Sequence, residues 1–138
     1  MKIVNEFPPN YQLIREVFRN CDEFKPIFSY GDIIYNPYNI NVTPDLEVHE
    51  EVHMKQQGED VEGWWNRYLI DKDFRLKQEI EAYGTQFHWV KSKIQNRILV
   101  EWSKEKMAQA LSGDMYGNLL SYGEAESKIR NYAKSLNK

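Results

Sequence analysis

The residues best suited to chemistry lie in the run His49-Glu50-Glu51-Val52-His53, which has the form His-Glu-x-x-His. Residues four apart on a helix share a face, so the imidazoles of His49 and His53 are expected about 6 Å apart. Two imidazoles at that spacing can bind one metal ion, and Glu50 can reach a water on the metal without binding the metal. The motif therefore predicts a catalytic site with one Zn2+ per chain and Glu50 as the general base.

The flanking residues favour a helix at this motif. Thr43-Pro44-Asp45 offers a capping hydroxyl, a proline at the first helical position and an acid in the first turn, and Gly58 offers a stop. Val48 and Val52 form an apolar stripe next to the metal-binding stripe. We expect this apolar stripe to anchor the helix to the core.

The rest of the chain predicts mostly helices around a small sheet. We expect a first helix from Asn10 to about Cys21, then strands between Phe28 and Tyr35 with a turn at Gly31-Asp32, and a third strand at Ile40–Val42. A helix capped by Asp60 should bury Trp64, Trp65, Tyr68 and Leu69, and a long helix from Asp71 or Asp73 should break near Asn96 and resume to Trp102. A shorter helix from Ser103 to Leu111 and a last helix with a capping box at Ser121 complete the expected elements.

Composition limits the classes of function. The chain has 138 residues, enough for one domain, and 14% aromatic residues, which favours a packed core. A net charge of -3 gives no reason to expect nucleic acid as a partner, and no segment is apolar enough for a membrane span. The single cysteine, Cys21, excludes a disulfide within the chain, and the N-terminus has no signal-peptide pattern. We expect a cytoplasmic protein, with a virion location or leaderless export as alternatives.

A catalytic zinc needs a third protein ligand, and two classes of zinc site supply it differently. The metzincin pattern would place Gly and His where this chain has Gln56 and Glu59, so that class is excluded. The other source is a glutamate on a later helix, where Glu79 and Glu81 both stand. They lie about 200° apart around a helix, so only one can face the metal. Glu81 would share its face with His88.

At Glu79-Ile80-Glu81-Ala82 the chain resembles the gluzincins, in particular small single-domain forms that include phage and bacterial metallopeptidases. The second helix of that family carries a Glu-x-x-Ala pattern, which nominates Glu79 as ligand, with Glu81 as the alternative. The resemblance implies one zincin-like domain over residues 1–138. That domain would be α+β and mainly helical, with a small N-terminal sheet or hairpin packed on the active-site helix and additional C-terminal helices. It also implies that a strand beside this helix pairs with an extended substrate.

The function implied is hydrolysis of peptide bonds in a peptide or protein substrate by a zinc metallopeptidase; the sequence does not indicate an oligomeric state. Two features depart from the family: Glu51 stands where an apolar residue is usual, and Tyr83 where several related families carry an acid. One alternative is therefore an inactive, metallopeptidase-like binding or structural module whose metal is structural, and another is a metal-free helical domain. The residues that could contact the oxyanion or substrate are Tyr83, His88, Tyr116 and Tyr122.

Overall fold

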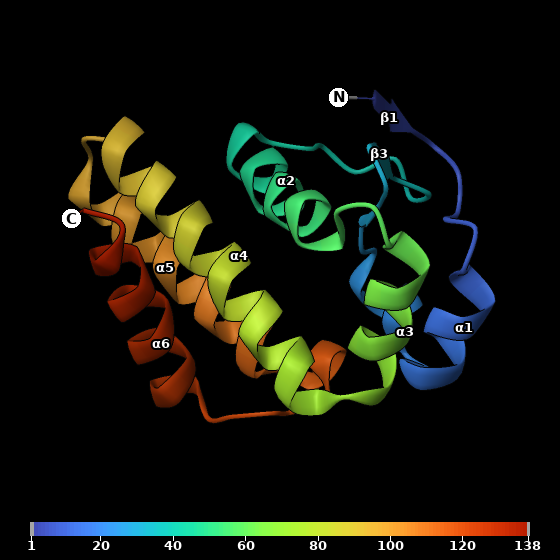
Figure 1. Cartoon of the computed structure of the whole chain (residues 1–138). Helices are drawn as coiled ribbons and strands as arrows, with labels where there is room; N and C mark the ends of the chain where they lie inside the picture. The colour runs from blue at the N-terminus through green and yellow to red at the C-terminus, as the bar shows by residue number, and fades with distance from the viewer. Residues whose placement is uncertain (1, 138) are drawn as a thin grey trace.

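The helices begin and end close to residues whose side chains favour a helix boundary. The structure, a computed structural model, describes residues 2–137. Over that range the chain is mainly helical with one small three-stranded sheet, which confirms the expected α+β class (Figure 1). The elements run in the order β1 (Lys2–Val4), α1 (Tyr11–Val17), the 3-10 turn η1 (Cys21–Phe24), β2 (Phe28–Tyr30), β3 (Ile33–Tyr35), α2 (Pro44–Gln57), α3 (Val61–Ile70), α4 (Lys72–Lys93), α5 (Arg97–Ser112), the 3-10 turn η2 (Asp114–Tyr116) and α6 (Tyr122–Ser135).

Capping side chains set the starts of the later helices. Asp60, Asp71, Asn96 and Ser121 each accept a hydrogen bond from a backbone N–H of the first turn that follows. The predicted capping box at Ser121 is confirmed. The predicted helix start at Ser103 is wrong, because Asn96 already caps α5 and the helix runs through Ser103 without a break.

The sheet has the predicted hairpin but a different third strand. Gly31, at φ +64°, makes the turn between β2 and β3. The third strand is β1, which pairs in parallel with β3, so the sheet order is β1-β3-β2. The prediction of a strand at Ile40–Val42 is wrong. The side chain of Asn36 donates to the carbonyl of Ile40 and accepts from its amide at 2.9 and 3.0 Å, and so takes the backbone groups that a strand would need.

The first helix is shorter than expected. It ends at Val17, and the chain then turns back through η1. Asp22 in this turn accepts hydrogen bonds from the hydroxyls of Tyr11 and Tyr38. These bonds hold α1, η1 and the loop after β3 together.

Helix α2 begins and ends where the sequence predicted, but it buries a different face. Gly58, at φ +55°, follows its last residue. The buried side chains of α2 are polar, whereas Val48 and Val52 are only half-buried. The prediction of an apolar anchoring stripe is therefore wrong. A buried polar face needs internal hydrogen bonds or a bound ion, and it is the face that carries the His-Glu-x-x-His motif.

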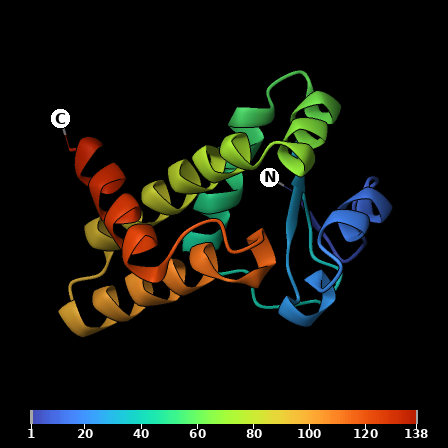
Figure 2. The ribbon, with the colours of Figure 1, turned by 90° about the horizontal axis from the view of Figure 1, so that it is seen from below.

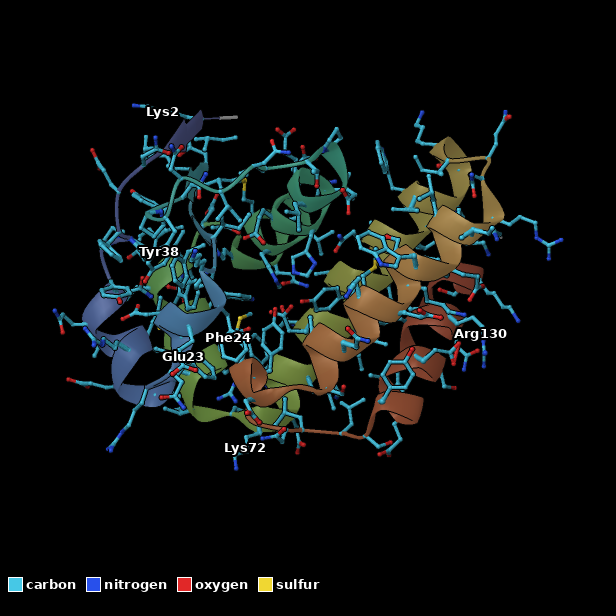
Figure 3. All side chains as sticks on the ribbon, turned by 180° about the vertical axis from the view of Figure 1, so that it is seen from behind. Lys2, Glu23, Phe24, Tyr38, Lys72 and Arg130 are labelled. Carbon is cyan, nitrogen blue, oxygen red and sulfur yellow. The ribbon has the colours of Figure 1, made fainter. Side chains whose placement is uncertain are left out.

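Two apolar clusters form the core, one on each side of α2. Figures 1 and 2 show α4, α5 and α6 on one side and the sheet with α1 on the other, and charged side chains such as Lys2 and Lys72 project outward in Figure 3. The predicted burial of Trp64, Trp65, Tyr68 and Leu69 is confirmed. Among the helices of residues 2–137, none combines the length with the hydrophobicity that a membrane span requires. The first cluster contains Ile14, Phe28, Trp64, Trp65, Tyr68 and Leu69, and the second contains Tyr83, Phe87, Val90, Met107, Ala108, Leu111, Tyr116, Ala125, Ile129 and Ala133.

Candidate metal centre

The motif side chains of α2 are buried and close together. His49 and His53 are 4% and 6% exposed, and their Nε2 atoms lie 3.2 Å apart. Together with Glu50 they offer ligand atoms that all lie within 4.8 Å of one another. This buried group could hold a metal ion.

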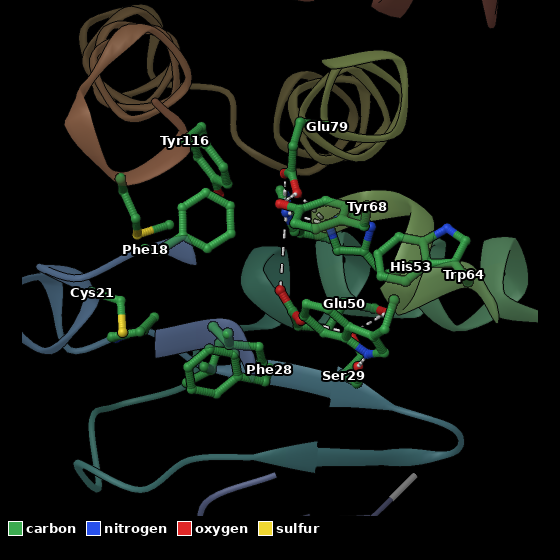
Figure 4. Close-up of a pocket in the computed structure, with 16 residues that line it drawn as sticks. Phe18, Cys21, Phe28, Ser29, Glu50, His53, Trp64, Tyr68, Glu79 and Tyr116 are labelled. Carbon is green, nitrogen blue, oxygen red and sulfur yellow. Dashed lines mark hydrogen bonds and ion pairs between the residues drawn. The ribbon is translucent and has the colours of Figure 1, made fainter. Parts of the chain in front are cut away.

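Glu79 on α4 brings its carboxylate to the same point. Its Oε1 lies 3.2 Å from Nε2 of His49 and its Oε2 lies 3.1 Å from Nε2 of His53 (Figure 4). In a tetrahedral zinc site with bonds of about 2.0–2.1 Å, ligand atoms lie about 3.3 Å apart. Each imidazole therefore has one carboxylate oxygen of Glu79 at about the separation that two zinc ligands need, Oε1 beside His49 and Oε2 beside His53.

A hydrogen-bond chain fixes the ring of His49. The amide nitrogen of Gln86 donates to Asp45 at 2.7 Å, so the amide oxygen faces Nδ1 of His49, 3.0 Å away. An amide oxygen only accepts, so Nδ1 of His49 carries the proton. The lone pair of Nε2 is then left for a metal ion.

A second hydrogen-bond chain fixes the ring of His53, and it includes Glu81, which bonds to Gln56 and not to the imidazoles. Gln56 donates its amide nitrogen to Glu81 at 2.6 Å and to the carbonyl of Gln78 at 3.0 Å, and its oxygen accepts from Nδ1 of His53 at 2.7 Å. The structure therefore brings Glu79 to the two imidazoles and places Glu81 one step further out.

The charges of the cluster favour a cation between the three side chains. With Nδ1 of each ring directed at an amide oxygen, the Nε2 atoms of His49 and His53 face each other beside Glu79, and Oε1 of Glu79 accepts no hydrogen bond from the described residues. Burial alone would lower the pKa of His53, but the charge of Glu79 raises this pKa to about 9. Burial alone would raise the pKa of Glu79, but the charge of His53 holds it well below its usual range. A metal ion would supply the positive charge without a proton.

Glu50 lies beside the three side chains. Its Oε2 is 3.9 Å from Nε2 of His49, while its Oε1 accepts a hydrogen bond of 2.7 Å from the hydroxyl of Ser29 on β2. Figure 4 shows Glu50 between Ser29 and the cluster. The sheet thus holds Glu50 at a distance that suits a base acting on water rather than a ligand.

Two cavities meet at His49 and Glu50. The inner cavity, of about 70 Å³, is lined mainly by apolar side chains of α1, η1, β2 and α3. The outer cavity, of about 300 Å³, lies between η1, α2 and the end of α5, and Phe24 is one of its lining residues. Pro26 and Ile27 line both cavities. A chain that entered through the outer cavity would therefore pass Glu50.

Gln57 closes part of the sheet edge beside α2. Its amide donates to the carbonyl of Ser29 and accepts from the N–H of Gly31, both at 2.8 Å, and Trp65 donates to the same carbonyl at 3.1 Å. Because β2 is an edge strand, an added strand would use these backbone groups. A substrate that paired with this stretch of β2 would have to displace Gln57.

The structure brings two of the four suggested oxyanion or substrate contacts to the site. The hydroxyls of Tyr83 and Tyr116 lie 2.9 Å apart, and the ring of Tyr83 lies 4.3 Å from that of His49. Burial raises the pKa of both tyrosines, so both stay protonated donors. The structure does not bring His88 or Tyr122 to the two cavities at the motif. His88 faces the C-terminal end of the chain and bonds to Asn137 at 3.0 Å, while Tyr122 is 43% exposed at the start of α6.

Several side chains that support the site were not identified from the sequence. Gln86 follows Glu79 on the same helical face, and this spacing is the one signal that pointed to it. Tyr68 was predicted only as a core residue. Its hydroxyl donates to Glu79 Oε2 at 2.6 Å. No sequence pattern pointed to Ser29, because its hydrogen bond to Glu50 depends on how the sheet packs on α2.

Comparisons with models of protein families, with curated proteins and with solved structures found no match to this chain. What the site does is therefore inferred from its own geometry.

Proposed function

We propose that this protein is a zinc-dependent peptidase of the gluzincin type. The observation that carries the proposal is the convergence of His49, His53 and Glu79 to separations of 3.1–3.2 Å. The resemblance to the gluzincins supplies the same three ligand types on two helices, and the packing of α2 against α4 supports a zincin-like fold. The substrate would be a peptide or protein segment.

His49, His53 and Glu79 would hold the ion, and the buried acceptors described above fit a divalent cation. A zinc ion bound there supplies Lewis acidity and lowers the pKa of a bound water to about 7. The surrounding side chains keep this site apart from bulk solvent, since each of the three ligands is at most 6% exposed.

Glu50 is the proposed general base. Ser29 holds one of its oxygens, which leaves the other toward His49 and the space where the two cavities meet. Glu50 would take the proton of the attacking water and give it to the amine that leaves. The paired hydroxyls of Tyr83 and Tyr116 are the nearest suggested donors for the negative charge that develops on the carbonyl oxygen.

Replacing Glu50 with Gln tests the mechanism. The E50Q variant should bind zinc as the wild type does but lose peptide hydrolysis by at least about 100-fold, the contribution of a general base. The neighbouring Glu51 is exposed, so E51Q is the matched control and should stay active. Hydrolysis of a peptide library by zinc-loaded E50Q at the wild-type rate would contradict the proposed role.

The same experiment separates the enzyme from a structural module. A metal held by α2 and α4 would link the two helices whether or not the protein is active. Metal-dependent stability in the wild type, with no turnover on any library peptide, would favour the module.

A further inference from the structure

The two oxygens of Glu79 have different surroundings. Oε2 accepts a hydrogen bond of 2.6 Å from the hydroxyl of Tyr68, whereas Oε1 is buried and accepts no hydrogen bond from residues 2–137. Each oxygen faces one imidazole at about the same distance, 3.2 Å to His49 and 3.1 Å to His53. Tyr68 is therefore what makes the two oxygens unequal.

The hydroxyl of Tyr68 is held in place from several sides. Its ring stacks on that of Trp64 with centroids 4.9 Å apart, and the guanidinium of Arg75 donates to the backbone carbonyls of Tyr68 and Leu69, each at 2.9 Å. Tyr68 is 5% exposed. A phenol fixed in this way has little freedom to leave the carboxylate.

We propose that Tyr68 is a positioning residue that assigns the two oxygens of Glu79, Oε2 to a hydrogen bond and Oε1 to the metal. The inference rests on the proposed metal site and specifies how the third ligand binds. Glu79 would then bind through one oxygen, and three protein ligands would leave a fourth position of the ion for water. Without the hydroxyl both oxygens become equivalent, and Glu79 can bind through both and crowd that position.

Cobalt substitution tests this assignment through the coordination number. Co2+ in a four-coordinate site absorbs visible light much more strongly than in a five- or six-coordinate site. Wild-type protein loaded with Co2+ alone should show the strong four-coordinate band. Tyr68→Phe keeps the ring and its packing and removes only the hydroxyl, and its band should be clearly weaker. Tyr11→Phe is the matched control, because Tyr11 packs against the same apolar cluster as Tyr68 but its hydroxyl bonds to Asp22, and its band should match the wild type.

The outcomes separate this inference from the proposed function. Absence of stoichiometric Co2+ or Zn2+ binding by the wild type would overturn both. A strong band that is identical in wild type and Tyr68→Phe would overturn only the role of Tyr68. X-ray absorption of the zinc-loaded wild type gives a check that needs no variant: about four light ligands support the assignment, and five or more contradict it.

Discussion

His49 is held by a glutamine amide where metal-binding histidines commonly meet a carboxylate or a backbone carbonyl. The amide is in turn held by Asp45, so the carboxylate acts through Gln86. The Gln56 amide plays the same part for His53. The two amides keep Nε2 of each ring directed at Glu79, where the proposed metal ion would lie.

Removing one of these amides should weaken the metal site without removing a ligand. For Gln86→Leu we predict zinc affinity about 10- to 100-fold lower than in the wild type, because His49 loses the acceptor that fixes its ring. Competition with a chromophoric chelator measures the difference. Gln12→Leu, at an exposed position of α1, is the control. Equal affinities in wild type and Gln86→Leu would show that the amide does not support the site.

Asp22 should make stability depend on pH. The hydroxyls of Tyr11 and Tyr38 lower the pKa of Asp22 below its ordinary value of 3.8. A lowered folded-state pKa stabilises the protein above pH 3.8, and this contribution is lost as pH falls through the folded-state pKa. Asp22→Asn should therefore be less stable than the wild type in urea unfolding at pH 7, and the difference should shrink below about pH 4. Exposed Asp32→Asn is the control; a difference that persists unchanged at low pH would contradict the assignment.

Single residues were predictable where a local pattern identified them. The His-Glu-x-x-His run identified His49 and His53 because helical spacing alone puts them on one face, and it identified Glu50 through the motif. Tyr68 was not identified, because an aromatic residue in an apolar helix is usually core, and it is core here as well as a donor to Glu79. A residue with two roles shows only the commoner one in the sequence.

At the scale of elements, helix starts and ends followed local chemistry. Thr43-Pro44-Asp45, Asp60 and Ser121 were predicted as starts, and the helices begin there. Which face α2 buries was not predictable from apolar spacing. The elements next to α2 supply hydrogen-bond partners for its polar side chains Glu50 and Gln57. These hydrogen bonds favour burial of the polar face over burial of Val48 and Val52. The prediction of a strand at Ile40–Val42 was wrong for a related reason, because the side chain of Asn36 bonds to the backbone groups of Ile40 that strand pairing would use.

Gly84 sets how closely α6 approaches α4. A Cβ built at Gly84 would lie 2.5–2.8 Å from atoms of the Tyr132 side chain, closer than real contacts allow. We predict that Gly84→Ala lowers the free energy of unfolding by about 1–2 kcal/mol, because overpacking outweighs the helix propensity gained. Chemical denaturation measures this change. Gly123→Ala in α6 should be neutral or stabilising, because a Cβ built at Gly123 would have no neighbouring atom within 4 Å. A stabilising effect at Gly84 would show that the helices separate easily.

At the scale of the whole molecule, α2 lies between two apolar clusters and carries a polar face into the space between them. Glu79 reaches this space from α4, Tyr68 from α3 and Ser29 from β2. The site therefore depends on the packing of distant segments. The sequence predicted the proposed ligands from one helix and a family pattern, but it could not predict the contacts that bring Glu79 to the two imidazoles and Glu81 to Gln56.

The zinc content of the purified chain, measured by elemental mass spectrometry with Glu79→Gln beside Glu81→Gln, is the most direct test of the proposed metal centre. The structure predicts about one zinc per chain in the wild type and in Glu81→Gln, and little in Glu79→Gln or His53→Ala, because only Glu79 faces both imidazoles. If the wild type held no stoichiometric zinc even after refolding with it, or if Glu79→Gln kept a full complement, the proposed metal centre would be wrong.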